Sequence, residues 1–371
     1  MADNFDDQGF QEPVIVGTMN ETDRKCPMCG GTMDFDPNLG QLHCPFCDYT
    51  EEIKQEEGVA VSAEEQDFLT AEETGNCNWG VETKTVICKS CAGEMVYDAL
   101  QSSGECPYCG SNQVMEAKGK NTLAPGGVCT FKVDDQSAAT KFKNWISKKW
   151  FCPKAAKENA KPKDMKGVYL PYWTFDTNTA SSYTAEYGIN RTEKRSDGST
   201  YTTTDWKKCS GDFEKFVDDK PVCGTGRYNQ GLLQGILPFD TADNKTYKPE
   251  YVAGFASERY SIGLKDAWTT GKAAIQSDLN SEITALIRKE HNADDVRSLK
   301  VKTEYSNIKY KYLLLPVWMA HFNYNGKVYN FMVNGQNGKV AGKIPISAAK
   351  VALAIGIGIA ACVALWFLVN L

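Results

Sequence analysis

The sequence predicts an α+β protein with two N-terminal zinc ribbons, a mixed α+β domain built on an antiparallel sheet, and one C-terminal transmembrane helix. Three observations predict this fold class. Paired cysteines occur twice at the same spacing, helical and strand patterns alternate through the middle of the chain, and an uncharged apolar run lies at its end. A chain of 371 residues is long enough for two or three domains.

The cysteine pairs predict two metal sites. In each set, a Cys-x2-Cys pair is followed by fourteen residues and a second Cys-x2-Cys pair. Four thiolates complete the tetrahedral coordination of a structural zinc ion and leave no open position for catalysis. Iron in a rubredoxin-like site would use the same ligands and is the alternative metal. We therefore expect two Zn²⁺ ions, held by Cys26, Cys29, Cys44 and Cys47 and by Cys88, Cys91, Cys106 and Cys109.

The two cysteine sets form an internal repeat. A shift of 62 residues places Cys26 on Cys88 and also aligns residues outside the cysteines. The further matches are Gly31 with Gly93, Met33 with Met95, Phe35 with Tyr97 and Asp36 with Asp98. This agreement indicates that one ribbon unit was duplicated.

The distribution of charge and the number of cysteines indicate in which cellular compartment the protein lies and which kind of partner it binds. The N-terminal stretch is acidic and lacks the apolar segment of a secretory signal, so fourteen cysteines predict metal binding in reducing cytoplasm rather than disulfides. Residues 1–125 carry 23 acidic and 7 basic side chains, whereas the remainder carries 24 acidic and 34 basic ones. The acidic ribbon half argues against a phosphate-binding surface there.

The residue patterns divide the chain into six segments. These are a disordered tail at 1–20, zinc ribbon one at 21–50, an acidic linker at 51–80, zinc ribbon two at 81–118, the α+β domain at 119–346 and the transmembrane anchor at 347–371. Within the linker, Ser62 and Glu65 have the spacing of a capping box, which predicts a short helix over 62–69.

The α+β domain shows both helical and strand periodicity. Apolar residues at helical spacing predict helices over 134–150, 230–237 and 264–290. Aromatic and β-branched runs predict strands at 168–175, 181–189, 201–207, 213–217, 296–305 and 310–324, and Asn325-Gly326 and Asn337-Gly338 predict hairpin turns after them. The phrases Tyr169-Leu-Pro-Tyr-Trp173 and Leu314-Leu-Pro-Val-Trp318 resemble each other, which points to a second, diverged repeat.

The segment 351–369 contains no charged residue. Nineteen helical residues span roughly 28 Å, which is close to the thickness of a bilayer core. Lys339, Lys343 and Lys350 precede the segment and predict a single-pass tail anchor with the N-terminal domains in the cytoplasm. Gly356 and Ala360 form a small-xxx-small pair through which two anchors could self-associate.

The motifs, taken together, resemble a group of uncharacterised bacterial membrane-anchored zinc-ribbon proteins. The resemblance lies in the Cys-Pro-x-Cys-Gly ribbons, the hydrophobic C-terminal segment, Gly167-Val-Tyr-Leu-Pro-Tyr-Trp-Thr-Phe-Asp176 and Val333-Asn-Gly-Gln-Asn-Gly-Lys-Val340. Members are often labelled as related to the primosomal helicase because of their cysteines. The sequence has no phosphate loop, so that activity is not expected here.

No sequence motif indicates that the protein is an enzyme. The sequence contains no Gly-x-Ser-x-Gly and no His-Glu-x-x-His, and no nucleophile or carboxylate partner is evident for His291 or His321. The third histidine, His43, adjoins Cys44 and could compete as a metal ligand, but four cysteines already complete the site. We expect a membrane adaptor that binds a protein partner through its ribbons. The alternatives are a nucleic-acid-binding protein tethered to the membrane, which salt-dependent binding would reveal, and an enzyme within 119–346, which a polar cleft would reveal.

Overall fold

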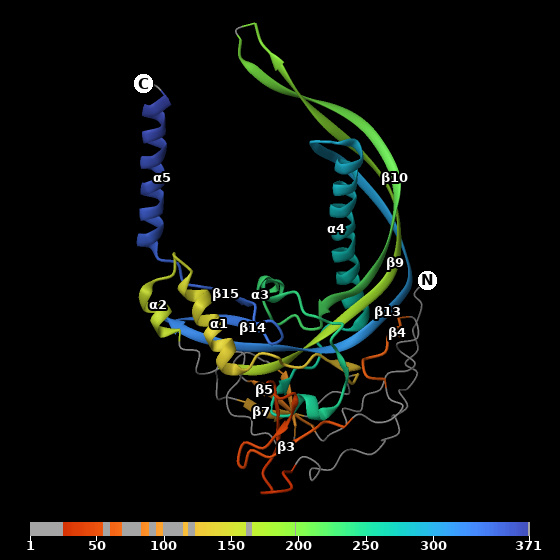
Figure 1. Ribbon diagram of the computed structural model, residues 1–371, viewed down its shortest axis with the longest axis vertical. Coiled ribbons are helices and arrows are strands. Elements are labelled where there is room, and N and C mark those ends of the chain that lie inside the picture. The colour runs from red at the N-terminus through yellow and green to blue at the C-terminus, as the bar shows by residue number, and fades with distance from the viewer. Residues whose placement is uncertain are drawn as a thin grey trace, which may run out of the picture.

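The computed structural model describes residues 25–54, 60–68, 83–88, 94–98, 114–117, 123–160, 165–196 and 198–369. The predicted disordered tail, most of the acidic linker and the ribbon-two cysteines Cys91, Cys106 and Cys109 lie outside these ranges, and of Cys88 the backbone is described. The described chain is mixed α+β with one apolar C-terminal helix, as the sequence predicts. Figure 1 shows a sheet-based body from which two long projections rise on the same side.

A small sheet at one end of the body holds the first cysteine set. Its order is β1-β2-β3, and both pairings are antiparallel. The strands are very short and cover β1 (Asp34–Asp36), β2 (Gln41–His43) and β3 (Thr50–Glu51). Four further strands from the N-terminal part of the chain belong to the large sheet: β4 (Gln66–Asp67), β5 (Thr83–Cys88), β6 (Glu94–Asp98) and β7 (Val114–Ala117).

A twelve-stranded sheet forms the body, with the path β11-β8-β13-β9-β12-β6-β5-β7 and with β10, β14, β15 and β4 attached beside it. Most pairs are antiparallel, and β12 with β9 and β8 with β13 are parallel. The remaining strands are β8 (Gly127–Val128), β9 (Lys166–Lys194), β10 (Thr200–Cys223), β11 (Lys245–Thr246), β12 (Ala256–Ser257), β13 (Asp295–Tyr324), β14 (Lys327–Asn334) and β15 (Val340–Gly342).

The helices lie at the periphery of the sheet, and three of them match the predicted ranges closely. They are α1 (Asp135–Ser147), α2 (Lys154–Asn159), α3 (Gln230–Ile236), α4 (Leu264–His291) and α5 (Ala348–Val369), with a 3-10 turn η3 (Pro249–Val252). Asp134 caps α1 by accepting a hydrogen bond from Ser137 N at 2.5 Å. The chain leaves α4 through Asn292 in the left-handed conformation, with φ of 47°.

Three strands are much longer than predicted. Together with α4 they build one of the projections, which we call the arm (residues 177–196, 198–217, 264–291 and 295–306). The predicted strands at 168–175 and 181–189 are one continuous strand, β9, and β10 and β13 each fuse two predicted strands. The polar side chains between the predicted strands are accommodated by hydrogen bonds in the sheet. Thr177 Oγ1 donates to Ser306 O at 3.0 Å, and Thr179 Oγ1 donates to Lys215 O at 2.7 Å. Irregularities between Val217 and Lys220 and between Ser306 and Lys309 bend the strands without ending them.

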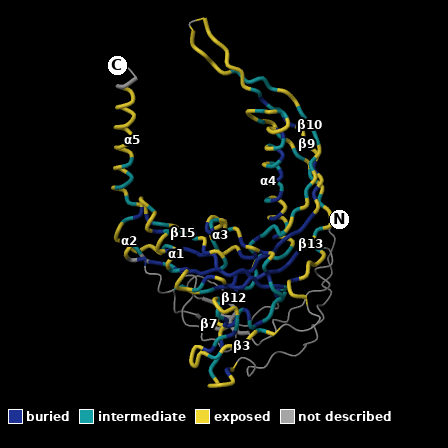
Figure 2. The backbone as a smooth tube through the Cα atoms, in the orientation of Figure 1, coloured by how far each residue is buried: buried dark blue, intermediate teal, exposed yellow. Residues whose placement is uncertain are grey.

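The hydrophobic core contains the apolar residues whose helical spacing predicted α4. In α4, the buried residues are Ala267, Gly271, Ile275, Leu279, Ile283 and Ile287, and this face packs on β9, β10 and β13. Figure 2 shows buried residues concentrated in the body, where β9 and β13 lie side by side. There the two related phrases are direct neighbours, with Leu314 opposite Pro171 and Pro316 opposite Tyr169.

The short helix predicted within the linker is wrong. Residues 62–68 do not form the predicted helix, and instead β4 pairs with β13, with Tyr310 opposite Gln66. Ala63 N donates to Asn244 Oδ1 at 2.7 Å, which fixes this part of the linker to the body. The strands β5, β6 and β7 continue the large sheet through the pairing of Ser257 with Val96.

Candidate metal centre and adjoining cleft

The first cysteine set converges as predicted. Cys26 and Cys29 come from the turn before β1, and Cys44 and Cys47 come from the turn after β2. All four sulfur atoms lie within 4.8 Å of one another. Cys26 Sγ is 3.4 Å from Cys47 Sγ, and Cys29 Sγ is 3.5 Å from Cys44 Sγ. This donor set fits one tetrahedral metal ion. The second set stays a prediction, because three of its cysteines lie outside the described residues.

Backbone geometry prepares the thiols for a cation. Gly30 adopts φ of 74° in the turn after Cys29, a conformation that glycine reaches without strain. Burial disfavours the thiolate of Cys26, but hydrogen bonds from the backbone N–H groups of Cys29 and Met28 and from the thiols of Cys47 and Cys44 together lower its pKa to about 7. The backbone N–H of Tyr49 favours the thiolate of Cys47. The hydrogen bond with the Cys26 sulfur and burial act in the opposite direction, and the pKa of Cys47 is raised to about 12. A cation bound at the centre would replace these shared protons.

His43 is not part of the sulfur cluster. Its Nε2 lies 3.3 Å from Asp48 Oδ1 on the ribbon surface. The other described cysteines are also outside the cluster. Cys129 is buried, and burial raises the pKa of its thiol beyond the usual range. Cys209 and Cys223 each have their thiol pKa raised by burial. Such thiols behave as small apolar side chains.

The ribbon is fixed to the body by a few apolar and backbone contacts. Phe35 packs edge-on against Tyr251, with ring centroids 6.1 Å apart, and Phe35 N donates to Ala253 O at 3.1 Å. Gly254, with φ of 83°, lies directly against Asp34, and a larger side chain there would clash. The four-cysteine cluster therefore has a set position relative to the body.

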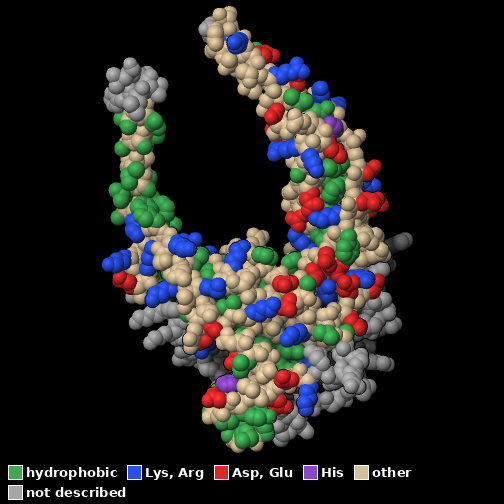
Figure 3. Space-filling view, viewed as in Figure 1, with side chains coloured by type: hydrophobic (Ala, Val, Ile, Leu, Met, Phe, Trp, Pro, Cys, Tyr) green, Lys and Arg blue, Asp and Glu red, His purple; other side chains and the backbone are tan. Residues whose placement is uncertain are grey.

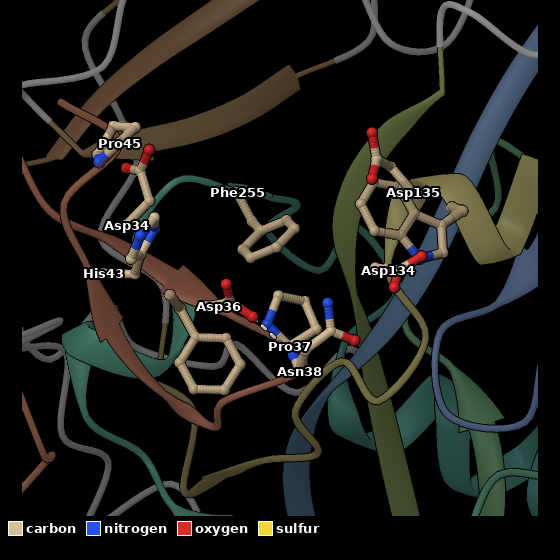
Figure 4. Close-up of a pocket in the computed structure, with 11 residues that line it drawn as sticks. Asp34, Asp36, Pro37, Asn38, His43, Pro45, Asp134, Asp135 and Phe255 are labelled. Atoms are coloured by element: carbon tan, nitrogen blue, oxygen red, sulfur yellow. Dashed lines mark hydrogen bonds between the residues drawn. The ribbon is translucent and has the colours of Figure 1, made fainter. Parts of the chain in front are cut away.

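A cleft of about 210 Å³ separates the ribbon from α1. Figure 4 shows Asp34, Asp36 and His43 on its ribbon side and Asp134 and Asp135 on its helix side. Phe255, Phe35 and Trp318 supply apolar surface, and no lysine or arginine lines it. The pKa of Asp134 is lowered, chiefly because the carboxylate accepts the Ser137 N–H. The cleft is thus an acidic recess with an aromatic wall.

No sequence pattern indicated this cleft. The ribbon acids contributed to the counted acidity of residues 1–125, but Asp134 and Asp135 were assigned to a helix start. No local pattern connects the turn after β1 to the start of α1, because about a hundred residues separate them in the chain.

A second carboxylate group was also missed and lies where the arm joins the body. Asp176, Asp218 and Asp219 have oxygens within 4.8 Å of one another. Lys311 Nζ lies 2.7 Å from Asp219 Oδ1, 3.6 Å from Asp176 Oδ2 and 3.7 Å from Glu65 Oε1. Since Lys311 supplies the positive charge at this position, we interpret the group as a structural ion-pair network.

Asp176 gives this network a measurable pH dependence. Burial raises the pKa of Asp176 to about 6, although the Asp219 N–H and Lys311 favour its charged form. Between about pH 4 and 6 the folded state therefore binds more protons at Asp176 than the unfolded state, and the free energy of unfolding contributed by this group falls as the pH rises. We expect Asp176→Asn to remove this contribution, measured as the difference between wild-type and variant urea unfolding from pH 4 to 7. The difference cancels the titration of groups that are remote from Asp176, such as the cysteines of the cluster. A constant difference across this range would contradict the prediction.

Comparisons with known proteins give one relative. The chain is 28% identical over 334 residues to the uncharacterized protein YdjG of Bacillus subtilis (strain 168), an alignment that covers 88% of this chain and 91% of the relative. No protein-family model matches the chain, and no solved structure matches it. The similarity extends over nearly the full length of both chains, and the name of the relative describes no activity.

Proposed function

We propose that the chain is a single-pass membrane adaptor that presents its metal-bound ribbon to a protein partner. The observation that supports this proposal is the separation of two surfaces on one connected body. The apolar helix α5 rises from one side, whereas the four-cysteine centre lies at the opposite end (Figure 1). The fixed contact between Phe35 and Tyr251 holds the ribbon in that position.

α5 has the composition of a membrane span. Its segment Ala348–Trp366 is long and apolar enough to cross a bilayer, and no part of it is buried in the protein. Leu353, Ile357 and Leu365 are each more than half exposed, so in water the helix would present a continuous apolar surface. Lys339, Lys343 and Lys350 lie on the body side of the helix, which under the positive-inside rule puts the body in the cytoplasm.

The arm restricts how α5 enters a bilayer. Figure 1 shows the arm and α5 extending in the same direction from the body. The arm carries surface ion pairs, such as Arg191 with Asp205 at 2.9 Å and Arg297 with Glu186 at 2.8 Å, which hydrocarbon does not accommodate. In a membrane, α5 therefore turns away from the arm. Because Ser347 and Lys350 are hydrogen-bonded to the loop between α1 and α2, we place this change of direction beyond the first turn of α5.

The tip of the ribbon supplies the partner surface. Met28 and Phe46 are the third residues of the two Cys-Pro-x-Cys turns, and they are 74% and 75% exposed. Leu39, in the turn between β1 and β2, is 52% exposed. Figure 3 shows hydrophobic side chains gathered at this end of the molecule, opposite α5. Such exposed apolar groups, held on a rigid turn, are typical of protein interaction sites.

The chemistry around the tip defines the partner class. The described ribbon residues 25–54 carry five acidic and two basic side chains, and a Zn²⁺ ion with four thiolates adds about two negative charges. The acidic cleft extends to Asn38 and Pro45, the chain neighbours of Leu39 and Phe46. A partner segment with an apolar anchor and flanking lysine or arginine residues complements this surface. The same negative charge disfavours the alternative of a nucleic-acid ligand at the ribbon.

Crosslinking in native membranes tests the adaptor proposal. We expect the double variant Met28→Ser and Phe46→Ser to reduce the yield of the crosslinked partner about tenfold or more, since interface anchors contribute about 1–2 kcal/mol each. The matched control is Phe216→Ser on the arm, which removes an aromatic side chain that is 56% exposed and is expected to leave the yield unchanged. An unchanged yield in the double variant, with zinc retained, would refute ribbon-mediated binding. A partner lost on nuclease treatment would support the nucleic-acid alternative.

A further inference from the structure

Lysines cluster where α5 leaves the body. Residues 136–160 contain six lysines and one glutamate, and residues 339–350 add three lysines and no acid. Figure 3 shows basic side chains gathered around the base of α5. We name the group on this surface the lysine collar, defined by Lys141, Lys148, Lys149, Lys154, Lys157, Lys343 and Lys350.

The collar is attached to the first turn of α5. Ser347 N donates to Phe151 O at 2.9 Å, and Lys350 Nζ donates to the carbonyl oxygens of Trp150 and Cys152, each at 2.8 Å. These bonds join the loop between α1 and α2 to the start of the apolar segment. The collar lysines on α1 and α2 therefore lie beside the chain at the point where it would enter the hydrocarbon.

Exposed apolar side chains accompany these lysines. Trp150 is 49% exposed, Phe151 is 43% exposed and Ile346 is 68% exposed. Tryptophan next to lysine is the composition of a surface that inserts at the level of lipid headgroups, where the ring is half in hydrocarbon and the amine remains in water. Exposed aromatic side chains next to lysines at the start of an apolar helix are unusual on the surface of a soluble protein.

A cleft within the collar has the size and charge for one headgroup. It encloses about 340 Å³ between α1 and the turn that joins β14 to β15. Lys141, Lys148 and Lys149 line it together with Trp145, and Lys149 Nζ lies 4.7 Å from the centre of the Trp145 ring. Among the described residues, neither Lys141 nor Lys148 forms an ion pair, and no carboxylate lines the cleft. Ammonium groups in this arrangement favour a phosphate anion.

We infer that the lysine collar binds the headgroups of anionic phospholipids in the membrane that α5 enters. This inference rests on the proposed membrane function. Continuity with the apolar helix favours lipid over nucleic acid, because the collar and the bilayer surface occupy the same level. The collar would hold the body against the membrane, while α5 supplies the anchor. Each lysine near an anionic surface contributes about fivefold to binding.

Chemical footprinting of the full-length chain in vesicles tests the inference. The chain is reconstituted in phosphatidylcholine vesicles, either pure or with about one phosphatidylglycerol in three lipids. Lysines are then acetylated with a neutral reagent, and the acetylated positions are identified by mass spectrometry. We expect acetylation of Lys141, Lys148 and Lys149 to slow about fivefold in the anionic vesicles at low salt and to recover at high salt. Lys194, Lys207 and Lys208 on the arm are exposed and serve as internal controls with unchanged rates.

Equal acetylation of the collar lysines in both vesicles would overturn the inference. So would equal slowing of the arm lysines, or stronger protection of the collar by a single-stranded oligonucleotide than by phosphatidylglycerol. Cys362, exposed on α5 in the structure, separates failure of the inference from failure of the anchor. If Cys362 is protected from a membrane-impermeant maleimide while the collar rates are equal, the collar inference alone fails. If Cys362 reacts in vesicles, the proposed anchor itself fails.

Discussion

Replacement of Cys26 with serine is expected to remove one equivalent of bound zinc and to unfold residues 25–54. The small sheet contains strands of two or three residues, and its core consists of Cys26, Met33, Leu42, Cys44 and Ala253. Such a core cannot balance the conformational entropy of the ribbon without the metal. In zinc-finger peptides, metal binding supplies about 10–16 kcal/mol, and that free energy is folding free energy.

Metal analysis and hydrogen exchange measure this effect. Zinc per chain is determined by elemental analysis, and loss of amide protection in β1 and β2 reports unfolding of the ribbon. Cys209→Ser is the matched control, because its sulfur bonds to Ala185 O on the arm and is remote from the cluster. Unchanged zinc content in Cys26→Ser would exclude the assigned centre. Iron in place of zinc would retain the ligands and change the identity of the ion.

Replacement of Lys311 with methionine is expected to reduce the free energy of unfolding by about 3–5 kcal/mol, because it leaves carboxylates buried without their counter-ion. The Asp176 side chain is 1% exposed and the Asp219 side chain is 13% exposed. Both lie where β9, β10 and β13 leave the body, so the loss falls on the attachment of the arm. Urea unfolding of the full-length chain in detergent, monitored by tryptophan fluorescence, measures it.

Two companion variants distinguish a buried ion pair from lost packing. Lys309→Met breaks the exposed pair with Glu65, at 2.9 Å, and is expected to cost less than about 1 kcal/mol. Adding Asp176→Asn to Lys311→Met is expected to restore a part of the stability, because it removes one of the stranded charges. A similar loss in Lys309→Met and Lys311→Met would show that burial of the network has no special effect.

Local sequence patterns correctly predicted those features of the fold that depend on residues close together in the chain. The spacing of Cys26, Cys29, Cys44 and Cys47 predicted that these four sulfurs meet, because two short turns in one hairpin unit determine their positions. The stripe from Gly271 to Ile287 predicted α4, and Asn325-Gly326 predicted the hairpin between β13 and β14, where both residues have positive φ. Each of these depends on residues that are close together in the chain.

The breaks predicted within the long strands were wrong, because contacts with other strands decide whether a strand continues. Thr177, Asn178 and Thr179 read as a polar break between two strands, yet β9 continues through them. Their neighbours on β10 and β13 provide hydrogen-bond partners, among them Ser306 O and Lys215 O, which a one-dimensional pattern does not contain. For the same reason, Ser62 and Glu65 were interpreted as a helix start, whereas pairing with β13 makes the next two residues, Gln66–Asp67, a short strand.

The sequence by itself determined the chemistry of this protein: four thiolates for a metal, an α+β domain, and a helix apolar on every side. The tertiary structure alone decided how these parts face one another. It brought Asp36 to Asp134 across the acidic cleft, set the ribbon against Tyr251, and joined Lys350 to Trp150 at the root of α5. Ligand spacing and helix periodicity are properties of neighbouring residues. The cleft and the lysine collar arise from packing between segments about a hundred or more residues apart in the chain, and such packing is encoded in no single segment.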